Sequence, residues 1–360
     1  MARAAAGGQG VTRAPVRVRS AGAAPHKARL RAANGDCLWQ GQTGWQAAGD
    51  PAAVAAAVEA VLAGWLLPAV EPWLADLALV GHRLVHGGTA FTAPTALSGP
   101  VLAQLEALVP LAPLHLPPAL AVIRWLSGRR PDLGQWACFD TAFHATLPPE
   151  AHTYGLPAAW RQRGLRRYGF HGLNHQHVSE TVVRPRLISC HLGAGCSLCA
   201  IAAGRSIATT MGFTPMDGLV MATRSGSVDP GLLLHLLRQG VGLGDLERGL
   251  NQEGGLLGLS DGLSASMKDL RQAAELGEPA ARLAIDVFRF GLVQALGAMA
   301  ASLGGVDAIA LTGGIGEHDR MLRQELEGAL GWLQPVELVV VPADEEGVIA
   351  RQCRAAAGLG

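Results

Sequence analysis

Charge is scarce in this sequence, and it is balanced. Only 16% of the 360 residues are charged, and 29 Lys and Arg offset 29 Asp and Glu. A protein that binds nucleic acid or another polyanion needs an excess of basic residues, and this chain has none overall. The composition therefore argues against those classes. The 49% hydrophobic content and the 47 glycines indicate packed cores with many tight turns, and they exclude a disordered chain, a collagen and a coiled coil.

Cysteine is too sparse for a disulfide scaffold. The six cysteines are scattered, and Cys196 and Cys199 form a lone CxxC without a second pair at zinc-site spacing. We therefore expect buried thiols in a reducing compartment. The sequence also contains neither a Walker loop nor a GxGxxG motif, so the two best-known phosphate-binding loops are absent.

Two segments raise the question of targeting. Residues 52–70 are apolar apart from Glu59, but alanine dominates them, so we expect a buried helix and no membrane span. No signal peptide is recognisable. Residues 1–35 are basic and contain no acid, which slightly resembles a transit peptide; we expect a degenerate or misassigned arm instead.

Short apolar runs alternate with longer helical stretches, which is typical of an α/β protein. The length favours two domains. Buried strands are predicted at 77–80, 136–139, 187–191, 307–311 and 337–341. Helices are predicted at 52–66, 117–127, 231–238, 265–276, 279–303, 319–330 and 344–357.

Polar and glycine residues gather where the predicted strands end. In open α/β sheets the ligand crevice lies outside the carboxyl ends of the strands. Two turns that follow strands, 191–195 and 312–317, contain several glycines and could present backbone N–H groups to phosphates. The sequence therefore predicts an anion site at these ends.

Several side chains could serve such a site. Arg83 and Arg224 lie among glycines and small residues, where a guanidinium is more useful for binding an anion than for packing. Histidines gather at 171, 175 and 177, but their spacing matches no standard metal motif, so a hydrogen bond from His171 to a phosphoryl group is the better hypothesis. Acids such as Asp140 and Glu345 could hold Mg²⁺ or simply favour a helix start, and the local pattern does not decide between these roles.

Taken together, these segments resemble the acetate kinase family. The matching blocks follow the family's order from about residue 76 onward: GHRLVHGG (81–88), LAPLH (111–115), FDTAFHATLP (139–148), RRYGFHG (166–172), HLGAG (191–195), MGFTPMDGL (211–219), TRSG (223–226), DPG (229–231), TGGIGE (312–317) and DEE (344–346).

The resemblance implies the fold shared by acetate and sugar kinases, actin and heat-shock chaperones. That fold has two domains of related, ribonuclease-H-like βββαβαβα topology with the active site in the cleft between them. We expect an N-terminal domain over 1–143, completed by a helix at 346–360, and a nucleotide-binding domain over 144–345. The implied reaction transfers a phosphoryl group reversibly from ATP to acetate, giving acetyl phosphate and ADP by direct in-line transfer. The resemblance also implies Mg²⁺, with Mn²⁺ as a substitute, a cytoplasmic homodimer, and no nucleic-acid or membrane partner.

Site residues follow from the same match. Asp140, His171 and Arg224 would be catalytic. Acetate would be held by Arg83 and by an apolar pocket of Val85, Leu114, Phe170 and Pro215. Magnesium would be held by Glu345 and Ser20. The nucleotide would contact Lys27, His191, Leu192, Gly193, Ala194, Gly195, Ser266, Met267, Lys268, Gly314, Ile315, Gly316, Glu317 and His318.

The sequence departs from the family at the nucleotide. The family's Asn-x-Gly-Ser-Ser-Ser-x-Lys turn has its best counterpart at 20–27, where Ser20 replaces Asn, and Ala23, Ala24 and Pro25 replace the serines. Losing such contacts, each worth about 0.5–1.5 kcal/mol, would weaken ATP binding. Two alternatives therefore remain: a catalytically impaired binding protein, and a kinase of propionate or butyrate. A metal hydrolase built on the histidines is a more distant alternative.

Overall fold

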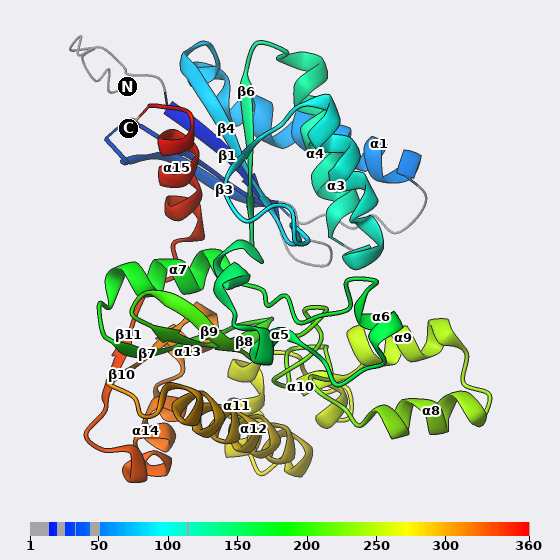
Figure 1. The fold of residues 1–360 in the computed structure, drawn as a ribbon, viewed down its shortest axis with the longest axis vertical. Coiled ribbons are helices and arrows are strands. Elements are labelled where there is room, and N and C mark those ends of the chain that lie inside the picture. Colours follow the sequence, from blue (N-terminus) through cyan, green and yellow to red (C-terminus); the bar gives the residue numbers. More distant parts are fainter. Residues whose placement is uncertain (1–13, 20–25, 33, 44–50, 114, 360) are drawn as a thin grey trace. The chain divides into compact units, whose positions relative to one another are not determined.

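The computed structural model describes residues 14–19, 26–32, 34–43, 51–113 and 115–359 (Figure 1). The chain forms two compact units. Unit 1 comprises Met1–Asp140 and Glu345–Gly360, and unit 2 comprises Thr141–Asp344.

These borders differ from those expected at 143/144 and 345/346. Residues 142–146 form a short 3₁₀ helix that packs against strand β9 (Arg205–Thr209) of unit 2. The hydroxyl of Thr146 donates a hydrogen bond to the carbonyl oxygen of Ser206 in that strand. Glu345 starts the helix that packs on the sheet of unit 1.

The sheet of unit 1 has the strand order β3-β2-β1-β4-β6-β5 among the described residues. β1 pairs antiparallel with β2, and β2 with β3, whereas β1, β4 and β6 are parallel; the short β5 is antiparallel to β6. The strands are β1 (Ala14–Arg19), β2 (His26–Arg31), β3 (Cys37–Thr43), β4 (Leu77–Leu84), β5 (Thr95–Ala96) and β6 (Gly134–Phe139).

Helices cover both faces of this sheet. Successive residues of a strand point to opposite faces. Val80 of β4 belongs to the core cluster that contains Val58 and Val122, whereas a Cβ on the neighbouring Gly81 would lie 2.6 Å from Cγ2 of Ile349. The first face is thus covered by α1 (Pro51–Val61) and α4 (Leu116–Arg129), and the second by α15 (Glu345–Ala356). Helix α3 (Gly99–Ala107) packs on α4.

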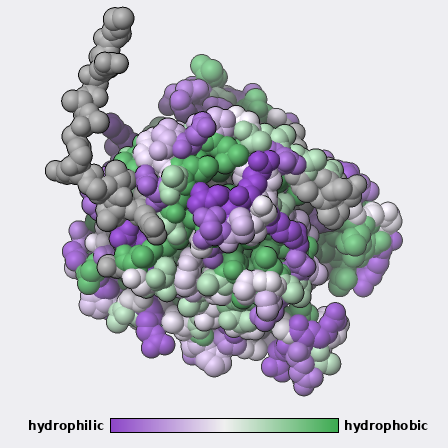
Figure 2. Space-filling model, turned by 90° about the horizontal axis from the view of Figure 1, so that it is seen from above, coloured by the Kyte–Doolittle hydropathy of each residue, from purple (hydrophilic) through white to green (hydrophobic). Residues whose placement is uncertain are grey.

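The apolar segment expected as a buried helix is helical but is buried on one side only. After α1 the chain continues as a π-helical turn (Leu62–Leu66), α2 (Leu67–Val70) and a 3₁₀ helix (Glu71–Asp76). Leu62, Leu66 and Val70 are buried against the sheet. Two segments, Ala56–Asp76 and Pro279–Leu303, are long and apolar enough to cross a membrane, but helices that pack in a protein core meet the same criteria. Viewed from above, hydrophilic and hydrophobic residues are interspersed over the surface (Figure 2).

Unit 2 repeats the sheet topology of unit 1. Its strand order among the described residues is β11-β10-β7-β8-β9. β7, β8 and β9 are antiparallel, and β7, β10 and β11 are parallel. The strands are β7 (Arg186–Leu192), β8 (Cys196–Ala202), β9 (Arg205–Thr209), β10 (Ala308–Thr312) and β11 (Glu337–Val340). Both sheets therefore have three antiparallel strands followed by two parallel ones, as the resemblance implies, and the sheet of unit 1 has the short antiparallel β5 in addition.

Four of the helices described in unit 2, α8 (Pro230–Arg238), α11 (Met267–Glu275), α12 (Pro279–Leu303) and α14 (Arg320–Ala329), begin at a residue whose side chain accepts a hydrogen bond from the first turn. The longest, α12, starts with a proline in its first turn, and Gly304 ends it in the left-handed conformation at φ 65°. The others are α5 (Pro149–His152), α6 (Ala158–Arg161), α7 (Gly172–Thr181), α9 (Leu243–Asn251), α10 (Gly255–Leu259) and α13 (Gly313–His318).

The cysteines are free, and five of them are buried; Cys37 is exposed, so the expectation of buried thiols is wrong there. Cys138 and Cys353 lie 3.5 Å apart in unit 1. Burial raises the pKa of Cys196 to about 11 and that of Cys199 to about 12, which keeps both thiols protonated and unreactive.

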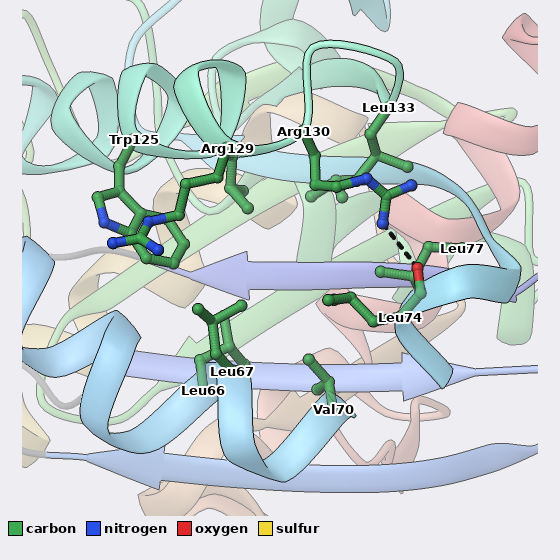
Figure 3. Close-up of a pocket in the computed structure, with 11 residues that line it drawn as sticks. Leu66, Leu67, Val70, Leu74, Leu77, Trp125, Arg129, Arg130 and Leu133 are labelled. Carbon is green, nitrogen blue, oxygen red and sulfur yellow. Dashed lines mark hydrogen bonds between the residues drawn. The ribbon is translucent and has the colours of Figure 1, made fainter. Parts of the chain in front are cut away.

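One cavity of about 30 Å³ lies in unit 1 between α2 and α4 (Figure 3). Leucines and Trp125 line it, and at its edge Nη1 of Arg130 donates to Leu74 O at 2.7 Å. Val80 reaches it from β4, so it lies on the sheet face opposite to that of Gly81 and Arg83. Its volume holds one or two water molecules, and its lining is apolar, so we assign it no role in binding.

Candidate active site

In unit 1, three predicted site residues meet at the ends of neighbouring elements. Arg83 lies near the end of β4, Asp140 follows the end of the parallel strand β6, and Glu345 is the first residue of α15. The guanidinium of Arg83 donates from Nε and Nη2 to the two carboxylate oxygens of Asp140, at 2.6 and 2.5 Å. Nη2 also lies 3.6 Å from Oε1 of Glu345. The structure thus brings together the residues that the sequence placed at the strand ends.

This triad is buried, with 4%, 1% and 3% of Arg83, Asp140 and Glu345 exposed. Burial alone would lower the pKa of Arg83, but the charges of Asp140 and Glu345 outweigh it, and the pKa is raised. The guanidinium therefore stays charged. Among the described residues, the carboxylates of Asp140 and Glu345 contact Nε and Nη2 of Arg83 and leave Nη1 on the other edge of the guanidinium. One edge of the fork is thus left for an anionic ligand.

Of the other site residues predicted in unit 1, the structure describes some and not others. Val85 follows β4 and is 7% exposed. Lys27 lies on β2, paired with Arg19, but its side chain lies outside the described part of the chain, as do Ser20 and Leu114. The substituted turn at 20–27 therefore falls largely outside the described residues.

In unit 2, His171 and Arg224 converge on Gly195. A Cβ at Gly195 would lie 2.7 Å from Nη2 of Arg224 and 3.2 Å from Nε2 of His171. A side chain at this position would displace the end of the Arg224 side chain and crowd the imidazole of His171. Nη1 of Arg224 donates to Pro215 O at 2.6 Å, which holds the guanidinium in place. Burial lowers the pKa of Arg224, partly offset by Cys196. Two nitrogen groups therefore flank one small space.

The backbone at His171 is strained. His171 has a left-handed conformation, φ 56° and ψ 20°, immediately before α7. Such a conformation costs a non-glycine residue about 1–3 kcal/mol and is retained mainly at functional sites. The preceding Phe170 is buried, and a Cβ at Gly169 would lie 2.6 Å from the ring of His144. Tight packing of the two residues before His171 thus restricts the backbone from which the imidazole projects.

Behind His171 lies a set of buried polar residues that includes His175 and two serines, Ser189 and Ser197, that the sequence pattern did not indicate. Nδ1 of His171 bonds Oγ of Ser197 at 2.9 Å, Ser197 bonds Nε2 of His175 at 2.9 Å, and Nδ1 of His175 bonds Oγ of Ser189 at 2.8 Å. The i, i+4 spacing of the two histidines was a usable signal, because such residues share one helix face. His177, by contrast, bonds Pro342 O at 3.1 Å. The three histidines therefore do not act as one cluster.

The two glycine turns lie side by side. His191 of β7 is paired with Thr312 of the parallel strand β10. A Cβ at Gly313, whose φ is 80°, would lie 2.7 Å from Leu192 O, and one at Gly193 would lie 3.7 Å from the N of Gly314. The close approach depends on glycine at 313, whereas the distance at Gly193 is an ordinary van der Waals contact. The rings of His191 and His171 stack at 4.2 Å, which links these turns to the Gly195 space.

Other residues assigned to the nucleotide make structural contacts. Oε1 of Glu317 accepts hydrogen bonds from the N–H groups of Gly313 and Ala343, each at 3.0 Å. Ser266 caps α11 by accepting from the N–H of Asp269, and Met267 is buried. Gly316 and Leu192 are buried, Ile315 is half-buried, and the exposed members of the set are Ala194, Lys268, Gly314 and His318.

Comparisons with known proteins agree with this geometry. The model of the acetokinase family matches residues 28–334. Acetate kinase of Synechococcus sp. strain JA-2-3B'a(2-13) is 45% identical over 313 residues, which cover 79% of this chain and 77% of that protein. The crystal structure of Porphyromonas gingivalis acetate kinase aligns with a TM-score of 0.82 at 29% identity, covering 96% of this chain and all of that one. A propionate kinase from Francisella tularensis subsp. tularensis aligns with a TM-score of 0.84 at 28% identity, covering 94% and 98%.

Proposed function

Because the chain belongs to the acetokinase family, we propose that it transfers the γ-phosphoryl group of ATP to acetate, giving acetyl phosphate and ADP, and that it also catalyses the reverse reaction. The convergence of His171 and Arg224 on the space beside Gly195 carries the proposal, because two nitrogen groups there can bind the oxygens of a transferring phosphoryl group.

The reaction makes modest demands on acid–base chemistry. Acetate is already ionised at neutral pH, so its oxygen can attack phosphorus while the bond to the bridging oxygen of ADP breaks. The barrier lies in bringing two anions together and in the charge on the equatorial phosphoryl oxygens. Arg224 supplies a positive charge there, and His171 supplies a hydrogen-bond donor. Both groups are fixed before the reaction, which lowers the cost of reorganising them.

Unit 1 provides the groups for acetate. We assign the remaining edge of Arg83 to the acetate carboxylate, with Asp140 holding the guanidinium in position through two short hydrogen bonds. Asp140 is thus a positioning group in this structure and need not exchange a proton. The apolar side chains of Val85, Leu114, Phe170 and Pro215 would contact the methyl group, as the family match implies.

Magnesium fits the chemistry of the acids in unit 1. Mg²⁺ prefers oxygen ligands and is usually held by one or two carboxylates together with phosphates and waters. Glu345, at the start of α15 and beside Arg83, offers such an oxygen, with Ser20 as the second expected ligand. When bound, Mg²⁺, or Mn²⁺ in its place, would neutralise charge on the phosphates. The turns at 191–195 and 313–318 would line the nucleotide.

Propionate is a specific second candidate for the acceptor, because a propionate kinase is among the similar structures. One methylene group changes discrimination by only about 1–3 kcal/mol. We propose acetate as the preferred acceptor and propionate as a slower one. We further propose a homodimer in the cytoplasm, as the family resemblance implies.

A hydroxamate assay for acyl phosphate tests the proposal. Purified protein is incubated with ATP and Mg²⁺, and with acetate, propionate or butyrate in parallel. Product is expected to form fastest with acetate and to be lost in Arg224→Ala. An inactive wild type that still binds acetate would support the impaired binding protein. Restoring an Asn-x-Gly-Ser-Ser-Ser-x-Lys turn at 20–27 would then show whether those substitutions are the cause.

A further inference from the structure

The buried chain Ser189–His175–Ser197–His171 runs from the core of unit 2 to the space beside Gly195. Its three hydrogen bonds are 2.8–2.9 Å long, and the first three residues are completely buried. It ends at Nε2 of His171, 3.2 Å from the position of a Cβ on Gly195. A continuous polar chain inside a core is costly unless every hydrogen bond is made, so its donors and acceptors have to match.

The secondary structure brings the four residues together. His171 comes immediately before α7, and the N–H of His175 in the first turn donates to the carbonyl oxygen of His171 at 3.0 Å, which keeps the two histidines close together. Ser197 of β8 is paired with His191 of β7, two residues from Ser189. Ser189 and His191 point to the same side of β7, and directly paired residues share a face. Both serine hydroxyls therefore lie on the sheet face beneath α7.

Counting protons leaves two arrangements. A serine hydroxyl donates one hydrogen bond, and a neutral imidazole carries one N–H and one acceptor nitrogen. In the outward arrangement Ser189 donates to His175, His175 donates to Ser197, and Ser197 donates to Nδ1 of His171, which places the proton of His171 on Nε2. In the inward arrangement every donor is reversed, and Nε2 of His171 carries a lone pair. A mixture either breaks a hydrogen bond or makes Ser197 accept from both histidines, which leaves its own hydroxyl hydrogen without an acceptor in the chain, so the two tautomers are coupled.

We propose that Ser197 and His175 are positioning residues that hold His171 in the tautomer protonated on Nε2. The inference rests on the proposed phosphoryl transfer at this site. Phosphoryl oxygens accept hydrogen bonds, so only the Nε2–H tautomer stabilises them; the other tautomer directs a lone pair at an anion. The partner of His171 is the hydroxyl of Ser197, which is neutral. A carboxylate in its place would add a negative charge beside the phosphoryl group. The full charge of Arg224 therefore remains available.

Ser197→Ala tests this role, because it removes the donor to Nδ1 of His171. We expect kcat to fall about 10–100-fold, while KM for acetate and for ATP stays within twofold, since the lost stabilisation concerns the transferring group. Ser206→Ala is the matched control. Ser206 is equally buried and bonds Nδ1 of His144 at 2.8 Å, but it lies outside the chain of hydrogen bonds, so kcat should stay within twofold.

¹⁵N NMR of the histidine rings provides a readout that does not depend on turnover. His171 should be protonated on Nε2 in the wild type and shift toward Nδ1 protonation in Ser197→Ala. Ser189→Ala, three hydrogen bonds away from His171, should shift the protonation in the same direction with a smaller loss of kcat, and it is the variant to use if Ser197→Ala does not fold. An unchanged tautomer, or kcat within twofold of wild type in a folded Ser197→Ala protein, overturns the inference. An inactive wild type overturns the proposed function. In that case the NMR result alone decides whether Ser197 and His175 set the tautomer of His171.

Discussion

The two units hold their functional side chains by opposite means. In unit 1, Arg83 is fixed by ionised partners, Asp140 and Glu345. In unit 2, His171 is fixed by neutral hydroxyls, and no carboxylate bonds Arg224 within the described part of the chain. An arginine whose charge is balanced by neighbouring carboxylates can orient an anionic substrate without binding it too tightly. An arginine with a carbonyl partner keeps its full charge for a more highly charged group. Under the proposed function, unit 1 would orient the acetate and unit 2 would stabilise the transferring phosphoryl group.

The largest expected effect comes from removing the charge in unit 2. Arg224→Ala should lower kcat about 10³-fold, because a cation at the transferring phosphoryl group is lost. The hydroxamate assay measures this. Arg248→Ala, which removes an exposed arginine paired with Asp245, is the control and should leave kcat unchanged. A loss below tenfold in Arg224→Ala would show that unit 2 does not provide the main stabilisation.

Removing the charge in unit 1 should act mainly on stability. Arg83→Ala leaves two buried acids without their counter-charge and should lower the free energy of unfolding by about 3–5 kcal/mol. Arg83→Lys keeps the charge but loses the bidentate contact with Asp140, so its free energy of unfolding should lie between those of wild type and Arg83→Ala. Urea unfolding at pH 7 measures both variants. If Arg83→Ala unfolds at the same urea concentration as wild type, the ion pairs contribute nothing to the fold.

Acid should weaken both units alike. Burial lowers the pKa of His86 in unit 1 and of His144 in unit 2 to about 4, from 6.5. In the unfolded chain each histidine binds a proton below about pH 6.5, whereas in the folded chain it binds one only below about pH 4. Stability is therefore lost as the pH falls through this range, by about 2 kcal/mol for each histidine at pH 5.

Urea unfolding of His86→Asn and His144→Asn at pH 7 and pH 5 measures these two contributions. Each variant should lose about 2 kcal/mol less than wild type between the two pH values. Equal losses in wild type and in His144→Asn would mean that His144 takes up its proton in the folded state.

The smallest effect concerns Ser266, which the sequence assigned to the nucleotide and the structure shows capping α11. Ser266→Ala should cost about 1 kcal/mol of stability and leave KM for ATP unchanged. Asp229→Ala, which removes the cap of α8, is the matched control. A tenfold rise in KM for ATP in Ser266→Ala alone would restore the nucleotide role.

The strands and helices with strong patterns could be predicted from the sequence. The predictions for 187–191 and 279–303 are confirmed as β7 and α12. β8 was missed because its residues are all apolar or small, so it shows no alternation. β2 was missed because it is rich in basic residues, which strands usually avoid.

The site was predictable only in part. Arg83 and Arg224 were recognisable because a charged side chain among glycines is unusual. Ser197 and Ser189 were not, because a serine within a strand carries no local signal for the partner that it will face. Their role depends on α7 lying over the sheet, which is a tertiary contact. The left-handed backbone of His171 was equally hidden, since histidine does not favour that conformation.

The order of segments along the chain has a consequence for synthesis. α15 packs on β1, β4 and β6, yet it emerges from the ribosome only after the whole of Thr141–Asp344 has been made. Unit 2 is continuous and can fold while synthesis proceeds, whereas the sheet of unit 1 has one uncovered face until the last helix arrives. During that interval Gly81 and its neighbours on β4 are exposed to chaperones and to other nascent chains.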